Sequence, residues 1–247
     1  MYFFSFLWYN KDDLCLKGEN NMYFDSTILF MIPGLLLGLW AQYKVKSAFS
    51  KYSKYATRSG VTAERAVARI LQQNGAGDVQ ITRVSGSLTD HYDPTTNTLR
   101  LSDSVYGSPS IAALGVAAHE AGHALQKAQN YPFLSLRSVM VPVVNIGSNL
   151  SWPIFLAGII FSWEPLMYAG IIAFALVVLF SLITLPVEFD ASRRAVALLN
   201  NGGFLTMEEE AGVKKVLNAA ALTYVASFVS ALLQLMRLLT ILNRNRD

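Results

Sequence analysis

The residues best suited to chemistry are the five of His119-Glu120-Ala121-Gly122-His123. On a helix, two histidines four residues apart project from one face, where their ring nitrogens can hold one Zn²⁺. Zinc lowers the pKa of the water that it binds, so Glu120 can take the proton of this water as it attacks a peptide carbonyl. Glu120 can then deliver the proton to the leaving amine. The spacing therefore predicts a zinc peptidase with one zinc ion per chain.

Histidine is scarce in this chain, which makes the motif informative. Only three histidines are present, so we expect a chance H-E-x-x-H in about one such sequence in a hundred or fewer. The motif also lies in an apolar, alanine-rich segment that follows a predicted strand. The alternative is a structural helix that carries two surface histidines.

A catalytic zinc site needs a third protein ligand and an open fourth position. The favoured ligand is Glu188, in the segment Pro186-Val-Glu-Phe-Asp-Ala-Ser-Arg-Arg-Ala195. We expect Pro186 to break the membrane helix, so that a new helix carries Glu188 inward. Asp190 is the alternative ligand, although it lies on a different helical face. Glu188 could instead be an interfacial carboxylate that pairs with the arginines Arg193-Arg194.

The third histidine, His91, lies in the predicted turn Leu88-Thr-Asp-His-Tyr-Asp-Pro94. A histidine or tyrosine near a zinc-bound oxygen can stabilise developing negative charge, so His91 is a candidate catalytic residue. A local bond to one of the neighbouring aspartates is the alternative. Tyr92 and Tyr224 are candidates for the same role, with structural tyrosines as the alternative.

The polar residues 60–137 must position the motif. Thr62 is expected to cap a helix that runs to about Asn74. Residues 79–84 and 98–102 alternate apolar and polar side chains, which predicts two short strands in a small β-hairpin. Ser108-Pro109 is a helix start, and it predicts a helix over about 109–129 that carries the zinc motif.

Four apolar runs are long enough to cross a membrane, at about residues 27–43, 139–161, 166–187 and 216–242. Lys44, Lys46 and Lys51 follow the first run, and such basic flanks stay in the cytoplasm. Only Ser162-Trp-Glu-Pro165 separates the second and third runs, which predicts a transmembrane hairpin. Both outer ends of this hairpin then lie on the basic, cytoplasmic side.

The last apolar run carries one polar stripe, which consists of Thr223, Ser227, Ser230, Gln234 and Arg237. Such a helix either spans the bilayer with its stripe towards the bundle or lies in the membrane plane. We favour the spanning helix, although Arg244 and Arg246 then lie outside.

Two asparagines, Asn145 and Asn149, lie one helical turn apart inside the second run. Polar groups in lipid usually bond neighbouring helices, and this is the favoured interpretation. The alternative is a place on a substrate path.

Composition supports a membrane protein and excludes several other classes. Apolar residues make up 53% of the chain and charged residues only 15%, against about 25% charged in soluble domains. The net charge of +3 is too small to predict nucleic acid as a partner. Cys15 is the only cysteine, which excludes an intrachain disulfide and a cysteine-based zinc cage. The first residues lack the basic region and cleavage site of a signal peptide.

These observations predict a mainly α-helical integral membrane protein. It has three to four transmembrane helices and a cytoplasmic zincin-like, gluzincin-type catalytic region with a small β-hairpin. The predicted parts are an N-terminal extension (1–21), a first transmembrane helix (22–43), the catalytic region (44–137), the transmembrane hairpin (138–187), the third-ligand helix and loop (188–215) and a C-terminal apolar or amphipathic helix (216–247).

Several segments together resemble the bacterial YugP-like neutral zinc metallopeptidases. They are the motif continuing as Ala124-Leu125-Gln126, the segment 88–94, the segment Val141-Pro-Val-Val-Asn-Ile-Gly-Ser-Asn-Leu-Ser-Trp152 and the segment 186–195. The resemblance covers residue 22 to the C-terminus. It implies a multi-pass membrane protein in which His119 and His123 bind one zinc and Glu120 is catalytic.

The architecture is also similar to that of the HtpX-like membrane metallopeptidases, in which a carboxylate from a later helix completes the site. In that wider group, an aspartate four residues after the ligand glutamate supports the site, and this chain has Ser192 there. Where the typical sequence has asparagine, this chain has Asp190.

The resulting hypothesis is a membrane-embedded zinc endopeptidase of the cell membrane, with its active site facing the cytoplasm and a protein or peptide as substrate. Strand 98–102 or its partner could pair with an extended substrate, which predicts broad specificity. Two other classes are a zinc-binding membrane scaffold or chaperone-like factor without peptidase activity, and a transporter-like helix bundle. Glu120 argues against both, since a structural zinc helix does not need it.

Overall fold

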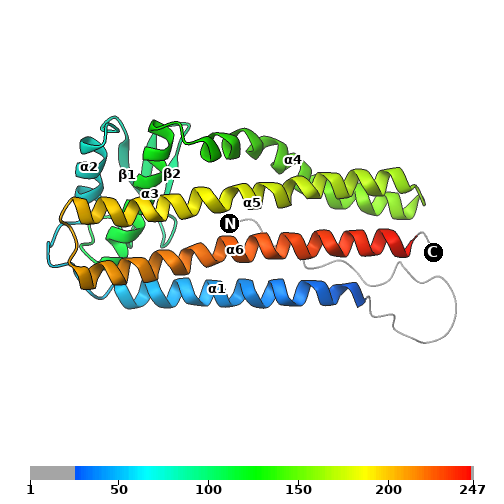
Figure 1. Cartoon of the computed structure of the whole chain (residues 1–247), viewed down its shortest axis with the longest axis horizontal. Coiled ribbons are helices and arrows are strands. Elements are labelled where there is room, and N and C mark those ends of the chain that lie inside the picture. The colour runs from blue at the N-terminus through cyan, green and yellow to red at the C-terminus, as the bar shows by residue number, and fades with distance from the viewer. Residues whose placement is uncertain (1–25, 246–247) are drawn as a thin grey trace.

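The computed structural model describes residues 26–245, so the predicted extension 1–21 lies outside the described residues. Figure 1 shows the order of the elements along the chain. They are η1 (Ser26–Phe30), α1 (Met31–Tyr52), α2 (Ala63–Gln73), β1 (Gln80–Val84), β2 (His91–Asp93), β3 (Thr98–Ser102), α3 (Ile111–Ala128), α4 (Pro132–Ile160), α5 (Glu164–Asn201) and α6 (Met207–Arg244).

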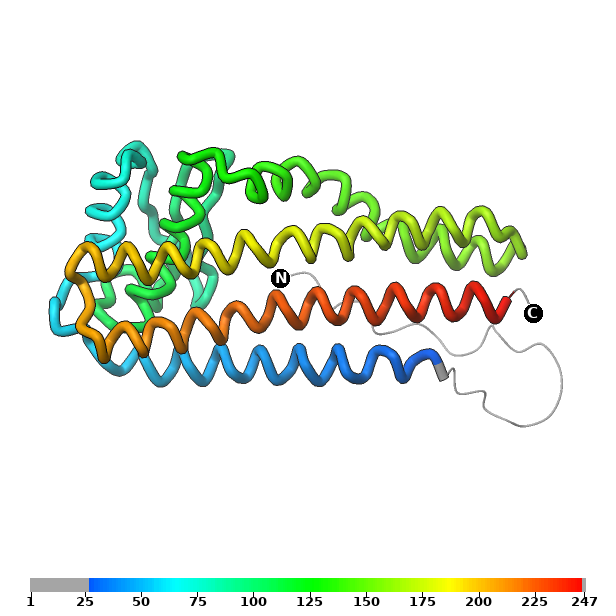
Figure 2. Tube along the Cα trace, viewed as in Figure 1, coloured from blue at the N-terminus to red at the C-terminus, as the bar shows by residue number. Residues whose placement is uncertain are grey.

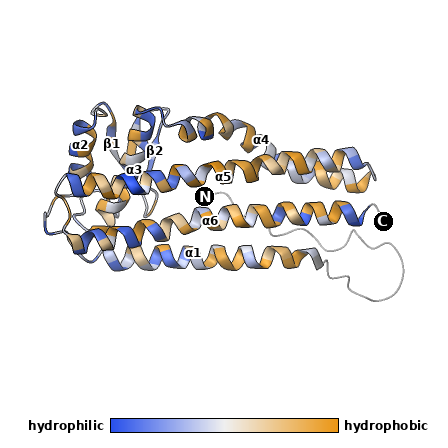
Figure 3. Cartoon of the chain, viewed as in Figure 1, coloured by the Kyte–Doolittle hydropathy of each residue, from blue (hydrophilic) through white to orange (hydrophobic). Residues whose placement is uncertain are grey.

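Four long helices, α1, α4, α5 and α6, are long and apolar enough to cross a membrane. They run along the long axis of the molecule, while α2, the strands and α3 gather at one end (Figure 1). Hydrophobic residues extend along the four helices, and hydrophilic residues concentrate around the gathered end (Figure 3). Large apolar side chains point outward, with Val139 72% and Ile172 63% exposed. Such a surface is suited to lipid rather than water.

The expected transmembrane hairpin is present, because α4 and α5 are joined by residues 161–163 alone. The last apolar run forms α6, which packs against α1 and α5 along its length. The start of α1, the α4–α5 turn and the end of α6 lie at the end remote from the strands (Figure 2). α6 is therefore a candidate membrane span that runs alongside the other three, in keeping with the interpretation favoured from its sequence.

The expected break at Pro186 is wrong, because α5 continues through this proline to Asn201. A proline removes one backbone hydrogen bond, and membrane helices tolerate this where neighbouring helices support the segment. Here α3 and α6 both pack against α5, and Val187 and Ala191 are fully buried beside the proline. Glu188 is therefore carried by the membrane helix itself, not by a separate one. The first helix also extends past its predicted end at 43, to Tyr52.

The expected hairpin of 79–84 with 98–102 is also wrong. The strands form a mixed sheet of order β1-β3-β2, in which β1 pairs in parallel with β3 and β2 pairs with β3 in antiparallel. The hairpin is β2–β3, closed by a turn in which the Asp93 carboxylate accepts bonds from the Thr95 and Thr96 backbone N–H groups. Three residues are too short to show an alternating pattern, which is why β2 was expected to be loop.

Helix α2 begins after Thr62 as predicted, but the Thr62 hydroxyl donates to the Glu64 carboxylate at 2.5 Å instead of capping the helix. Helix α3 begins at Ile111 rather than at the expected Ser108-Pro109. The carbonyl groups of Ser108 and Pro109 accept bonds from Ala63 and Thr57, which keeps both residues in a loop. Ser110 caps α3 instead, with its hydroxyl accepting from the Ala113 N–H.

Small residues bring α3 very close to α5. Its buried alanines form the core of the gathered end, and Gly122 lies against the backbone of Ala191 on α5. A methyl group at Gly122 would lie 2.8 Å from the Ala191 carbonyl oxygen, so only glycine fits there without a shift. This approach sets the motif of α3 directly opposite Glu188.

Candidate metal centre

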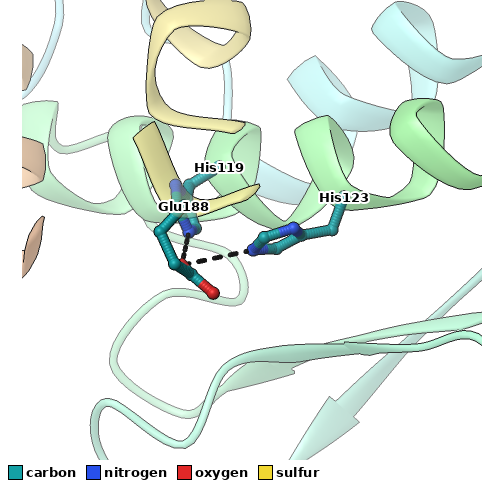
Figure 4. Close-up of side chains that lie close together, drawn as sticks. All are labelled: His119, His123 and Glu188. Atoms are coloured by element: carbon teal, nitrogen blue, oxygen red, sulfur yellow. Dashed lines mark hydrogen bonds and ion pairs between the residues drawn. The ribbon is translucent and has the colours of Figure 1, made fainter. Parts of the chain in front are cut away.

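His119, His123 and Glu188 converge on one point between α3 and α5. The Nε2 atoms of His119 and His123 lie 3.2 Å and 3.5 Å from the same Glu188 oxygen, Oε2 (Figure 4). The two imidazole rings are 4.7 Å apart between centroids and nearly perpendicular, at 86°. One ligand atom from each of the three residues lies within 4.8 Å of the others.

The spacing of these atoms fits zinc. Ligands at 2.0–2.1 Å in a tetrahedral site lie about 3.3 Å from one another, and the two histidine–glutamate distances are 3.2 Å and 3.5 Å. Two imidazole nitrogens and one carboxylate oxygen are also the donor set that catalytic zinc prefers. His123 and Glu188 are buried, and burying the negative charge of the Glu188 carboxylate is costly in free energy unless a positive charge lies beside it. The predicted third ligand, Glu188, is thus the carboxylate that the structure brings to both histidines.

The second nitrogen of each imidazole has a partner. Nδ1 of His119 lies 3.1 Å from the Ser192 hydroxyl, and Nδ1 of His123 lies 3.0 Å from the Gln126 carbonyl oxygen. Such contacts hold the ring in the tautomer whose Nε2 can bind a metal. Ser192 therefore supports the site at the position where the HtpX-like group has an aspartate.

Asp190, the alternative third ligand, is not brought to the two histidines, and the group that could hold a metal ion consists of His119, His123 and Glu188. The Asp190 carboxylate accepts bonds from the Gln126 amide at 2.9 Å and from Arg193 and Arg194. The pairing with the two arginines was proposed for Glu188, and it belongs to Asp190. Gln126 also donates to the Val187 carbonyl at 2.8 Å, so this fully buried amide ties α3 to α5 beside the metal ligands.

Glu120 lies beside the three ligands and not among them. Its carboxylate accepts a bond of 2.9 Å from the Tyr92 backbone N–H on β2. This contact joins the motif helix to the sheet and leaves the second oxygen of Glu120 for other partners. The outer edge of β2 thus lies next to the Glu120 carboxylate.

His91 and the Tyr92 phenol are not brought to the cluster. His91 is exposed, and its Nδ1 bonds the Thr89 carbonyl at 2.9 Å. The Tyr92 hydroxyl donates to Asn97 at 2.6 Å, and burial together with nearby aspartates raises the pKa of Tyr92 to about 12. Tyr224, in contrast, lies on α6 close enough to Glu188 for the two side chains to interact.

Electrostatics couple the ligands to one another. Burial disfavours the charged form of His123, but the hydrogen bond and charge of Glu188 outweigh burial and raise the pKa of the imidazole. Protons and a metal ion therefore compete for the same nitrogen.

Two supporting residues carried no assigned role in the sequence-based prediction, Gln126 and Ser192. Gln126 lies three residues after His123 and so on the same helical face, which is a signal that spacing alone could have supplied. Ser192 could be singled out only through the resemblance to the HtpX-like group, because its contact with His119 depends on how α5 packs on α3.

Two imidazoles and one carboxylate, of which His123 and Glu188 are buried, with the second glutamate Glu120 beside them, are typical of the zinc peptidase class. The family model described as "Putative neutral zinc metallopeptidase" matches residues 27–243 of the chain. The chain therefore belongs to this family, and the resemblance predicted from its motifs is confirmed.

A curated relative agrees with this assignment. The chain is 49% identical over 220 residues to the "Putative membrane protease YugP" of Bacillus subtilis (strain 168). The alignment covers 89% of this chain and 98% of the relative. No solved structure matches the chain. Family and relative together support a multi-pass membrane protease that uses zinc.

Proposed function

We propose that the protein is a membrane-embedded zinc endopeptidase in which His119, His123 and Glu188 hold one zinc ion. The observation that carries the proposal is the convergence of both Nε2 atoms on one Glu188 oxygen, at distances that fit a shared ion. When bound, zinc would polarise the scissile carbonyl and lower the pKa of the attacking water.

Glu120 is the general base of this proposal. It lies on the helix between the two histidine ligands, and its carboxylate is fixed by the Tyr92 N–H. A carboxylate held in this way can accept the proton of the attacking water and deliver it to the leaving amine. The His91 ring contacts the Thr89 carbonyl and Arg100 of β3 rather than the cluster, so the general acid–base steps are assigned to Glu120 alone.

Strand β2 is the proposed docking edge for the substrate backbone. β3 is the central strand and has no free edge, whereas β2 pairs with β3 on one side and reaches Glu120 on the other. An extended peptide that added to this edge would lie next to the zinc ligands. Such pairing reads the backbone more than side chains, which favours broad specificity.

The active site is proposed to face the cytoplasm. Lys44, Lys46, Lys51, Lys54 and Arg58 lie at and after the end of α1, at the end of the molecule that contains the motif helix. Basic residues of this kind favour the cytoplasmic side of a membrane.

The test is casein cleavage by purified protein in detergent. Glu120→Gln should keep one zinc per chain and lower the cleavage rate about 10²- to 10⁴-fold, because only the base is lost. Glu208→Gln makes the same chemical change at an exposed glutamate in the first turn of α6 and should cleave normally. Full activity of Glu120→Gln would refute the mechanism. Cleavage by the wild type that needs no metal ion would refute its assignment to the zinc peptidases.

A further inference from the structure

The C-terminal part of α5 and the N-terminal part of α6 lie beside each other at the end of the molecule that contains the strands (Figure 1). A groove between them has a volume of about 570 Å³, within the range of about 300–1,000 Å³ that is usual for ligand sites. None of the three candidate metal ligands lines this groove, although Ser192, which contacts His119, does. A ligand held there would lie beside the metal centre and not in it.

The lining of the groove is basic. Arg193 of α5 and Lys214 of α6 both contribute to it, and their side chains are 79% and 54% exposed. The amides of Asn200 and Asn218 add hydrogen-bond donors. No carboxylate is among the described residues that line the groove. A ligand that is complementary to this lining carries negative charge.

The carboxylates near the two cations do not cancel this positive charge. Asp190 bonds both Arg193 and Arg194, so one carboxylate faces two guanidinium groups. Its bond with Arg193 uses Nη2, and a guanidinium has further N–H groups on its other two nitrogens. Lys214 pairs with Glu210, and an ion pair at the surface contributes little to stability. Both cations are therefore able to bind an anion in the groove at a small cost in free energy.

The groove also has an apolar part, at the expected boundary of the bilayer. The third apolar run ends at about residue 187, and Phe189 lines the groove just beyond it with 49% of its surface exposed. Arg193 lies four residues further, which is about 6 Å along the helix. The headgroup layer on each side of a bilayer is about 5–8 Å thick, so Arg193 lies at the level of the lipid phosphates.

We propose that this groove binds an anionic phospholipid, with Arg193 and Lys214 on the phosphate and an acyl chain against Phe189. Basic pockets between membrane helices are suited to anionic lipid headgroups. An arginine can donate several hydrogen bonds to one phosphate, and the flexible stem of a lysine lets its ammonium reach the same group. The proposal does not depend on the peptidase function, because binding can be measured in Glu120→Gln.

The choice of a lipid follows from the two parts of the groove. A free phosphate would leave the exposed surface of Phe189 uncovered, and a peptide backbone has no charge to match Arg193 and Lys214. A second copy of the chain, with its net charge of +3, would bring more positive charge to a basic surface. An anionic lipid satisfies both the charge and the apolar part.

The first test is native mass spectrometry of the full chain in detergent, with equal amounts of phosphatidylglycerol and phosphatidylcholine added. The two lipids have the same acyl chains, and only phosphatidylglycerol carries a net negative charge. We expect wild type to retain phosphatidylglycerol roughly tenfold more than phosphatidylcholine, since two cations of the groove face its phosphate.

Arg193→Gln/Lys214→Gln should lose this preference, because it removes both cations of the lining. Lys214→Gln leaves the bonds of Asp190 intact and should lower the preference about threefold or more, so the test does not depend on how the double variant folds. Arg69→Gln/Lys46→Gln removes the same charge at exposed positions of α2 and α1 and should keep the preference.

Three results of this test would overturn the proposal. The first is a preference that Lys214→Gln and the double variant keep in full. The second is an equal loss in Arg69→Gln/Lys46→Gln, which would show that only the net charge matters. The third is a dimer that wild type forms and Arg193→Gln/Lys214→Gln does not, which would make the groove an interface between two copies.

A second measurement separates the lipid from other ligands. Phosphatidylglycerol should raise the unfolding temperature of wild type in detergent more than that of Arg193→Gln/Lys214→Gln, because a ligand stabilises the state that binds it. Inorganic phosphate at the same concentration should raise neither. Equal protection of wild type by inorganic phosphate would make the groove a site for a free anion and overturn the lipid. Displacement of phosphatidylglycerol by an uncharged apolar peptide would assign the groove to a protein segment and also overturn it.

Discussion

The candidate metal centre and the apolar helix α6 each bury a glutamine, Gln126 and Gln234, yet the two amides differ in how they are paired. At the metal centre the amide of Gln126 bonds His123, Val187 and Asp190. On α6, the amide of Gln234 has no partner within residues 26–245. Paired groups fix a geometry in advance, whereas unpaired groups are suited to an incoming ligand.

Removal of a paired group should have the largest effect. Gln126→Leu leaves the Val187 carbonyl and the His123 Nδ1 without their partner, so we expect zinc affinity to fall about 10- to 100-fold. We also expect the free energy of unfolding to fall by about 2–3 kcal/mol. Zinc titration and thermal unfolding in detergent measure these effects. Gln73→Leu, at an exposed glutamine of α2, is the matched control, and equal behaviour of the two variants would contradict the pairing argument.

The close approach of α3 to α5 gives the next effect. Gly122→Ala places a methyl group 2.8 Å from the Ala191 carbonyl oxygen. The Ala191 atoms that this methyl group meets belong to the backbone of α5, so they cannot rotate away as a side chain could. We therefore expect a loss of about 1–3 kcal/mol in the free energy of unfolding, with weaker zinc binding. Gly38→Ala on α1 is the control, because nothing lies within 4 Å of its added methyl group. A stable Gly122→Ala protein would show that the two helices can separate freely.

Removal of the unpaired amide of Gln234 should have the opposite effect on stability. Gln234→Leu removes a buried amide that has no partner in residues 26–245, so we expect the free energy of unfolding to rise by about 1 kcal/mol. Thermal unfolding in detergent measures this effect. A destabilised Gln234→Leu protein would mean that the Gln234 amide is paired in the folded protein, as the Gln126 amide is.

The smallest effect concerns the β2–β3 hairpin at low pH. Hydrogen bonds from Thr96, Thr95 and Arg100 hold the pKa of the Asp93 carboxyl below its usual value. A lowered pKa in the folded state adds stability above the unfolded pKa of about 3.9. This stability is lost as pH falls below that value through the folded pKa. In Asp93→Asn, the unfolding temperature should fall less steeply below about pH 4 than it does in wild type. An equally steep fall in both proteins would exclude Asp93 as the source of the pH dependence.

The sequence alone was sufficient for the residues that follow a helical period. His119 and His123 lie on one face because of their spacing, and the long apolar runs became the four membrane-spanning candidates. Glu188 was identifiable because it closes the third apolar run. These features depend on local periodicity, which is determined by residues that are close together in the sequence.

Features set by tertiary packing could not be predicted in this way. Pro186 is a helix breaker by its own propensity, but packing of α3 and α6 against α5 overrides it. β2 exists because it pairs with β3 and reaches Glu120, not because three residues favour a strand. The exposure of Asn145 likewise depends on which neighbours α4 has.

The most direct test of the metal centre is zinc content per chain after dialysis against a weak chelator. Wild type and Glu120→Gln should each retain one zinc ion, and Asp190→Ala should retain a measurable fraction. His119→Ala and Glu188→Ala should retain none. A Glu188→Ala protein that kept its full zinc while Asp190→Ala lost it would contradict the ligand set and the mechanism built on it.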